Sequence, residues 1–290
     1  MKKITVRRHD GFGCHILWSI IALELAKINH SELEFVYTKL PESYKEMKSG
    51  IQDTGKMFEW EYHNVFGSED LAEVNILFSK IMKSIGVDTI ERSNMDCLNL
   101  GLKSNIGPLM EVQKLNRKDY FTTGILEKIR NVYYDLTDKP EIYDDEFVNI
   151  AIHVRRGDDL TGRTPRKKDH RNSYRWIPGK KYCAILEKLS NIENSMVHVF
   201  SQSSAGIADH WHKKNNIIFH QEEFGSGLFF DHWNKLVRSD ILVLSPSAYS
   251  HSAGLFSKGN VITIEDNRSV FPFSPAAWSK NRNLYLGETQ

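Results

Sequence analysis

The sequence predicts an α/β protein whose sheets are parallel and whose chain forms two lobes. The second half alternates short apolar stretches of strand character with helix-like stretches of about ten residues, an order typical of parallel sheets covered by helices. The first residues contain the same unit once, as strand, glycine-containing turn, helix and strand. A polar break near 138–143 separates these parts, so we expect lobes at 1–142 and 143–265 and a weakly patterned tail at 266–290.

Hydrophobic periodicity predicts the elements of the first lobe. Apolar residues three and four positions apart indicate helices, and short runs rich in β-branched residues indicate strands. The expected strands are 4–6 and 33–37, and the expected helices are 15–28, 70–85 and 117–136. Gly86 and Pro140 follow the second and third helices, as is typical after a helix end. Residues 88–115 have neither pattern, and we expect them to be irregular.

The second lobe has the clearer pattern. The expected strands are 147–154, 197–201, 217–220, 241–244 and 261–264. The expected helices are 178–189, 204–213, 229–238 and 249–256. Strictly alternating strands and helices predict one parallel sheet, and in such sheets ligands bind at the carboxyl ends of the strands.

Composition excludes several classes of protein. The formal net charge is +1 at pH 7, so no global field attracts a polyanion, and we expect no nucleic-acid partner. The three cysteines are widely spaced and odd in number, which favours a reducing compartment over a disulfide framework or a metal site. No apolar run approaches the roughly 20 residues of a membrane span, and the start of the chain lacks a signal-peptide core. We therefore expect a cytoplasmic protein.

One segment at the end of the strand 147–154 carries the most chemical information. His153, Arg155, Arg156 and Asp158 follow one another around Gly157, at the carboxyl end of a buried strand. Two guanidinium groups are suited to a diphosphate, because they donate bidentate hydrogen bonds and never lose their charge. The ordinary alternatives are a solvated strand end for the arginines and a satisfied core histidine for His153.

The same residues match a known motif. The pattern His-x-Arg-Arg-x-Asp, met here by His153, Arg155, Arg156 and Asp158, resembles the first motif of the superfamily of α1,2-, α1,6- and O-fucosyltransferases. The resemblance implies a GT-B fold, two Rossmann-like lobes facing a cleft, in which the tail packs back on the first lobe. It also implies that Arg155 grips the β-phosphate of GDP-fucose. Eukaryotic members of the secretory pathway carry a membrane anchor, so its absence points to a bacterial, viral or cytosolic protein, or to a trimmed chain.

A glycine-rich turn follows the first strand of the chain. Gly11 and Gly13 let the backbone approach a ligand, and the following helix amino terminus supplies N–H donors, although a tight turn is an equally ordinary explanation. Its position is similar to the family's Gly-x-Gly-Asn-Gln loop, with Cys14 and His15 in place of Asn and Gln. The glycines are therefore candidate donor-binding residues.

The later lobe has a second group of candidates. A hydroxyl-rich turn after a buried strand can bind phosphate oxygens through hydroxyls and helix N–H groups, whereas a helix N-cap explains only one serine. The resemblance implies donor binding by Asp231, Asp240, Ser247, Tyr249 and Ser250. Ala248 replaces a family hydroxyl, so that phosphate contact is lost or moves to Ser252.

Gln202 replaces an acid that the family usually has at the end of the second strand of this lobe. An amide can pair with a base or a sugar hydroxyl, but it lacks the preference of a carboxylate for guanine. The donor is therefore GDP-fucose or another nucleotide sugar such as UDP-xylose.

The expected chemistry is a metal-independent transfer with inversion at the anomeric carbon. The chain contains no Asp-x-Asp, so we expect no metal and no cofactor, and positive side chains stabilise the leaving diphosphate instead. We expect Asp158, Arg155 and His153 to be catalytic. Asp158 is the candidate base, with an equally weighted alternative as an ion-pair partner that orients the arginines.

Candidate residues for binding the acceptor come from two places. Asp10 and His15 lie beside the glycine turn of the first lobe, and Tyr174 and Trp176 end a long basic loop of the second. The partners expected are therefore a nucleotide-diphosphate sugar and a glycan acceptor. A rival of another class is a non-catalytic protein that binds a glycan or a nucleotide.

Overall fold

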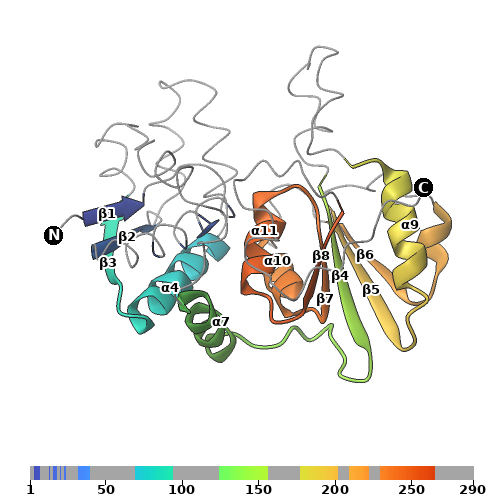
Figure 1. Cartoon of the computed structure of the whole chain (residues 1–290), viewed down its shortest axis with the longest axis horizontal. Helices are drawn as coiled ribbons and strands as arrows, with labels where there is room; N and C mark the ends of the chain where they lie inside the picture. The colour runs from blue at the N-terminus through green and yellow to red at the C-terminus, as the bar shows by residue number, and fades with distance from the viewer. Residues whose placement is uncertain are drawn as a thin grey trace, which may run out of the picture. The chain divides into compact units, whose positions relative to one another are not determined.

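The computed structural model of the chain divides into two compact units, Met1–Asp138 and Lys139–Gln290 (Figure 1). The structure describes residues 3–6, 13, 16–17, 20, 23, 32–39, 69–93, 124–155, 177–201, 209–221 and 229–264. The predicted tail at 266–290 lies outside the described residues. The predicted lobe boundary, and the mutual arrangement of two lobes around a cleft, stay predictions.

The first unit contains a three-stranded parallel sheet with the order β1-β2-β3. Its strands are β1 (Lys3–Val6), β2 (Glu32–Lys39) and β3 (Asp88–Ser93). The first two confirm the predicted strands. The third corrects the prediction that residues 88–115 are irregular, because Asp-Thr-Ile-Glu-Arg-Ser is too short and too charged to have a strand pattern of its own. Pairing with β2 along its whole length makes it a strand.

Two helices of this unit, α4 (Glu69–Ser84) and α7 (Ile125–Leu136), contact each other. Helix α4 buries Phe78, Ile81 and Met82 at the expected helical spacing, and Gly86 follows its end with a φ of 82°. Helix α7 begins later than predicted. Gly124 precedes it with a φ of 75°, in the left-handed region, so the α7 helix cannot extend backwards through this residue.

The helix predicted at 15–28 is described at five positions. Gly13, Ile16, Leu17, Ile20 and Leu23 are all helical and buried. The spacing of three and four residues places them on one face, and Ile16, Ile20 and Leu23 belong to the apolar pattern that predicted this helix. Gly13 is therefore part of the helix, rather than of the turn in which it was expected.

The second unit contains a five-stranded parallel sheet with the order β6-β5-β4-β7-β8. Its strands are β4 (Val148–Val154), β5 (Ser195–Ser201), β6 (Ile217–Gln221), β7 (Ile241–Leu244) and β8 (Asn260–Thr263). The chain starts in the middle with β4, adds β5 and β6 on one side, and returns to add β7 and β8 on the other. The predicted parallel α/β fold is confirmed, and the strand order reverses between β4 and β7.

Helices cover both faces of this sheet (Figure 1). Helix α9 (Gly179–Leu189) packs on one face, and α10 (Phe229–Arg238) and α11 (Ala248–Phe256) pack on the other. These agree with the predicted helices. The helix predicted at 204–213 is described only from Asp209 to Lys213, where it is a 3₁₀ helix, η3.

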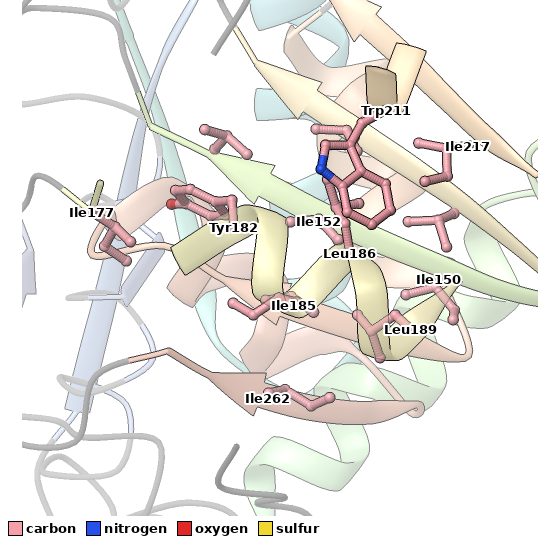
Figure 2. Close-up of a cluster of buried hydrophobic side chains, with 14 residues drawn as sticks. Ile150, Ile152, Ile177, Tyr182, Ile185, Leu186, Leu189, Trp211, Ile217 and Ile262 are labelled. Atoms are coloured by element: carbon pink, nitrogen blue, oxygen red, sulfur yellow. The ribbon is translucent and has the colours of Figure 1, made fainter. Parts of the chain in front are cut away.

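The face under α9 forms an apolar core (Figure 2). Alternate residues of β4, among them Ile150 and Ile152, meet Tyr182 and Leu186 of α9, and all four side chains are almost fully buried. Each such side chain stabilises the fold by roughly 1.5–3 kcal/mol relative to exposure. This core holds β4 rigidly, and β4 in turn positions the residues at its carboxyl end. Among the described residues, no helix has the length and apolar character required to cross a membrane.

Candidate functional site

The candidate site lies at the carboxyl ends of β4 and β7, where the strand order reverses. Open α/β sheets bind ligands at such a point, because the loops after the two strands run in opposite directions and leave a crevice between them. Val154 ends β4 and Leu244 ends β7, and the residues that follow them carry Arg155 and the turn Ser245–Ser247. The motif predicted from the sequence and the hydroxyl-rich turn therefore meet at one edge of the sheet.

Arg155 and Ser247 join the two sides of this edge. The Nη1 atom of Arg155 donates a hydrogen bond to Ser247 Oγ, over 3.3 Å, between residues 92 positions apart in the chain. Ser247 precedes α11 in the N-cap position, with extended backbone and no side-chain bond to the helix. The N-cap explanation of the turn therefore does not account for its hydroxyl. A fixed positive charge, a hydroxyl and a helix amino terminus lie together, and each is a group that binds phosphate oxygens.

His153 contacts the same turn. Its Nδ1 atom and Ser245 Oγ are 2.5 Å apart, and the His153 ring lies 5.3 Å from that of Tyr249. Ser245 Oγ is also 3.4 Å from Ser250 Oγ. Ser250 donates to the backbone oxygens of Ser245 (3.0 Å) and Ser247 (3.3 Å). His153, Tyr249 and Ser250, all predicted site residues, are thus brought together around Ser245.

Electrostatics keep His153 uncharged. Burial lowers the pKa of His153, and the nearby Arg155, His251 and His232 act in the same direction, so that together they bring it to about 3. Burial also lowers the pKa of His251, in α11, to about 4. A histidine of such low basicity is a poor general base near neutral pH, because catalytic proton transfer is most efficient when the pKa lies near the operating pH.

A cluster of rings extends from this site along the carboxyl ends of β5 and β6. The Phe200 ring stacks on His220 at 4.5 Å between centroids, and His232 of α10 packs edge-on against Phe200 at 5.1 Å. His198 Nδ1 and His220 Nε2 are 3.0 Å apart. The pKa of His198 is lowered to about 4, first by burial and then by Lys235.

Asp231 lies in the first turn of α10, on the same face of the sheet as these rings. Because α10 follows β6 and precedes β7, it begins at the carboxyl edge, on the side of the candidate site. The carboxylate is half-exposed and forms an ion pair with Lys235 one turn along. Its charge acts within the ring cluster, where it partly offsets the lowering of the His220 pKa.

Asp240, by contrast, lies at the opposite edge of the sheet. Its Oδ2 accepts a hydrogen bond from Asn149 N (2.8 Å), and its own N–H donates to Asn149 O (2.9 Å). Its backbone oxygen accepts from Asn260 N (2.8 Å). Asp240 therefore ties the amino ends of β4, β7 and β8 together, roughly 20 Å along the strand from Arg155. Donor binding by Asp240 stays a prediction that this position does not favour.

The other predicted site residues lie outside the described residues, apart from Gly13, which is helical and buried. They are Asp10, Gly11, His15, Arg156, Asp158, Tyr174, Trp176 and Gln202. Ser245 and His232 belong to the site but were given no role from the sequence. Ser245 had a local signal, since it is the first hydroxyl after the buried strand β7. His232 had none, because only the packing of α10 brings it to Phe200.

Ser252, which was considered as a replacement phosphate ligand, uses its hydroxyl elsewhere. Ser252 Oγ accepts a hydrogen bond from Trp233 Nε1 (2.9 Å) and donates to Tyr249 O (2.8 Å). Its side chain therefore fastens α10 to α11. Among the described residues, no three side chains of the metal-binding types are grouped to hold a metal ion. Metal independence stays a prediction, since Asp158 and Asp159 lie outside that part of the chain.

Comparison with known proteins gave matches among solved structures only. No family model and no curated protein matches the chain. An α1,6-fucosyltransferase, NodZ, soaked with GDP-fucose is 13% identical, covers 93% of this chain and 97% of its own, and has a TM-score of 0.49. The fucosyltransferase NodZ from Bradyrhizobium is 13% identical, with coverages of 88% and 93% and a TM-score of 0.43. The glycotransferase of kitacinnamycin is 10% identical, with coverages of 98% and 85% and a TM-score of 0.33.

These scores and identities are too low to assign a fold family or an activity to this chain. Its own residues define a class: a parallel α/β protein with a candidate anion site at the reversal point of its second sheet.

Proposed function

We propose that the protein is a glycosyltransferase that moves a sugar from a nucleoside-diphosphate donor to a glycan hydroxyl, with L-fucose from GDP-fucose as the favoured donor. The observation that carries this proposal is the hydrogen bond from Arg155 to Ser247 at the start of α11. It supports a diphosphate site at the place where the His-x-Arg-Arg-x-Asp resemblance expects one. Arg156, the second arginine of the motif, directly follows Arg155.

The proposed mechanism is a direct displacement. The acceptor hydroxyl oxygen attacks the anomeric carbon, the bond from that carbon to the β-phosphate oxygen breaks, and the configuration inverts. Negative charge grows on the leaving diphosphate, and Arg155 with the amino terminus of α11 stabilises it. These groups need no rearrangement as the charge develops, because β4 and α11 already hold them in place.

A base must take the proton of the acceptor hydroxyl. We assign this role to Asp158 and not to His153, whose pKa of about 3 makes it a weak proton acceptor. We assign acceptor binding to Asp10 and His15, beside the glycine turn, and to Tyr174 and Trp176, at the end of the long basic loop.

Two alternatives are kept. Gln202 in place of an acid favours a donor with another base, such as UDP-xylose, on the same fold. The replaced Asn, Asp and hydroxyl positions of the family pattern also permit a protein that binds a nucleotide or a glycan without turnover. Detectable transfer, or slow hydrolysis of a donor, would exclude the binding-only alternative.

The first test is calorimetric titration of GDP and UDP, separately, in buffer with EDTA. Binding of GDP alone supports a fucosyl donor, whereas binding of UDP alone keeps the site and changes the donor. Absence of binding by both would overturn the metal-independent diphosphate site. A follow-up assay with GDP-fucose, in which nucleotide release is measured with and without candidate glycans, separates transfer from binding.

A further inference from the structure

The backbone pairing between β4 and β7 stops before the candidate site begins. Partners run from Ile150 with Ile241 to Ile152 with Val243, whereas pairing of β4 with β5 continues to Val154 with Ser201. The next residue of β4 is His153. The two sides of the reversal point are therefore joined beyond Val243 by side chains and not by the ladder of backbone hydrogen bonds.

His153 supplies the first of these side-chain links. Its Nδ1 contacts Ser245 Oγ, directly beyond the last residue of β7. Arg155, two residues further along the chain and on the same side of the strand, supplies the second link to Ser247. One strand end thus contacts both serines of the turn that leads into α11.

The turn itself is held by bonds that start at Ser245. Ser247 N donates to Ser245 O over 2.7 Å, and the fully buried Ser250 donates to the same oxygen. His251 N then donates to Ser247 O over 2.9 Å and begins the hydrogen bonding of α11. Displacement of Ser245 would therefore also displace Ser247 and the first turn of the helix.

We propose that His153 is a positioning residue, whose hydrogen bond to Ser245 fixes the turn Ser245–Ser247 so that Ser247 and the α11 amino terminus bind donor phosphate. This inference rests on the proposed function and adds to it the means by which the phosphate-binding groups are aligned. His153 reaches the donor through Ser245 and does not transfer a proton. The burial of His153 beside the positive charge of Arg155 agrees with this role, because an imidazole kept uncharged retains a nitrogen that accepts a hydrogen bond.

The test is a double-mutant cycle on GDP and UDP affinity, measured by calorimetry on the chain of residues 1–290. His153→Leu and Ser245→Ala each remove one side of the bond, and we expect each to weaken nucleotide binding about tenfold. The double variant should lose about tenfold in nucleotide affinity and not a hundredfold, because the two changes break the same interaction. His153→Asn, whose amide lies near the Nδ1 position, should restore affinity to within about threefold of the wild type.

The matched control is Ser257→Ala. Ser257 is also fully buried and accepts a hydrogen bond, from Gly259 N over 3.0 Å, but it lies at the other end of α11. We expect it to lower thermal stability with unchanged nucleotide affinity.

The outcomes separate the two proposals. Suppose that the wild type binds GDP or UDP and that His153→Leu and Ser245→Ala bind the same nucleotide equally well. This result would overturn the positioning role of His153 and leave the proposed function standing. The positioning role would also be overturned if the losses of nucleotide affinity in the two single variants added up fully in the double variant, or if His153→Asn did not restore affinity. A wild type that binds neither nucleotide would overturn the proposed function and this inference with it.

Discussion

At the scale of single residues, the charge of Arg155 is the feature on which the proposed activity depends most directly. We expect Arg155→Ala to reduce transfer to background and to weaken GDP or UDP binding by one to two orders of magnitude, since charge-assisted hydrogen bonds contribute about 1.5–3 kcal/mol. Arg155→Lys should have transfer activity and nucleotide affinity between those of the wild type and Arg155→Ala, because lysine keeps the positive charge and lacks the planar guanidinium. The fold should persist, since Arg155 is only partly buried at a strand end.

Lys188→Ala is the control for this change. It also removes one positive charge from the second unit, but at an exposed position in the last turn of α9. Thermal unfolding of all variants checks that they remain folded. If Arg155→Ala is folded and binds GDP or UDP with the affinity of the wild type, Arg155 does not bind the phosphate.

The buried histidines predict a loss of stability in acid. Burial lowers the pKa of both His198 and His251 from 6.5 to about 4, so both stay neutral in the folded state while the unfolded chain takes up protons below pH 6.5. Stability should therefore fall as the pH drops from 6.5 towards 4, by about 2 kcal/mol at pH 5 for each of the two. Urea unfolding at pH 7, 6 and 5 measures the effect.

His251→Gln tests the assignment of this pH dependence. It removes one titrating group from α11, so the stability curve should become flatter over the same range. Equal stability of the wild type at pH 7 and pH 5 would contradict the prediction.

At the scale of the elements, the turn between α11 and β8 is closely packed on the amino end of β7. A Cβ at Gly259 would lie 2.3 Å from the backbone oxygen of Ser239 and 2.6 Å from that of Asp240. Gly259→Ala therefore requires backbone movement, and we expect a loss of about 1–3 kcal/mol in the free energy of unfolding.

Lys258→Ala, at the exposed neighbouring position, should change stability by less than about 0.5 kcal/mol. Chemical denaturation of both variants makes the comparison. Because Gly259 lies at the edge opposite Arg155, nucleotide affinity of folded Gly259→Ala should be unchanged, and a large loss of affinity would show that the two edges are coupled.

At the scale of the whole molecule, the second unit has its own sheet and its own core. A fragment of residues 139–290 is about 150 residues long, a size at which a domain commonly folds alone. We expect this fragment to unfold cooperatively and to bind GDP or UDP within about threefold of the full chain, since Arg155, Ser247 and α11 all lie within it.

The same fragment tests the glycine turn of the first unit. A folded fragment that fails to bind a nucleotide bound by the full chain would show that the first unit, with Gly11 as its candidate, completes the donor site. Circular dichroism and thermal unfolding establish whether the fragment is folded before the titration is interpreted.

The elements of the second unit, and the residues at their ends, could be predicted from the amino-acid sequence. All five strands and the α9, α10 and α11 helices were predicted within a few positions, because burial on one or both faces leaves a local period in the sequence. Arg155 was predicted as a site residue from the pair of arginines and the motif at a strand end, and Ser247 from the hydroxyl-rich turn after a strand and from the resemblance. Strand β3 was not predicted because its sequence has no apolar alternation, and its strand conformation comes from pairing with β2.

Which of these strand ends meet could be seen only in the folded structure. The strand order places β7 beside β4, and this brings Ser245 to His153 and Ser247 to Arg155 across 92 residues of chain. Asp240 lies at the opposite edge because it directly precedes β7, although it was predicted for the same site as Ser247. The physical reason is that the hydrophobic periodicity of a segment depends only on which of its own faces are buried. Strand order depends instead on packing between segments distant in sequence, for which a single sequence carries no local signal.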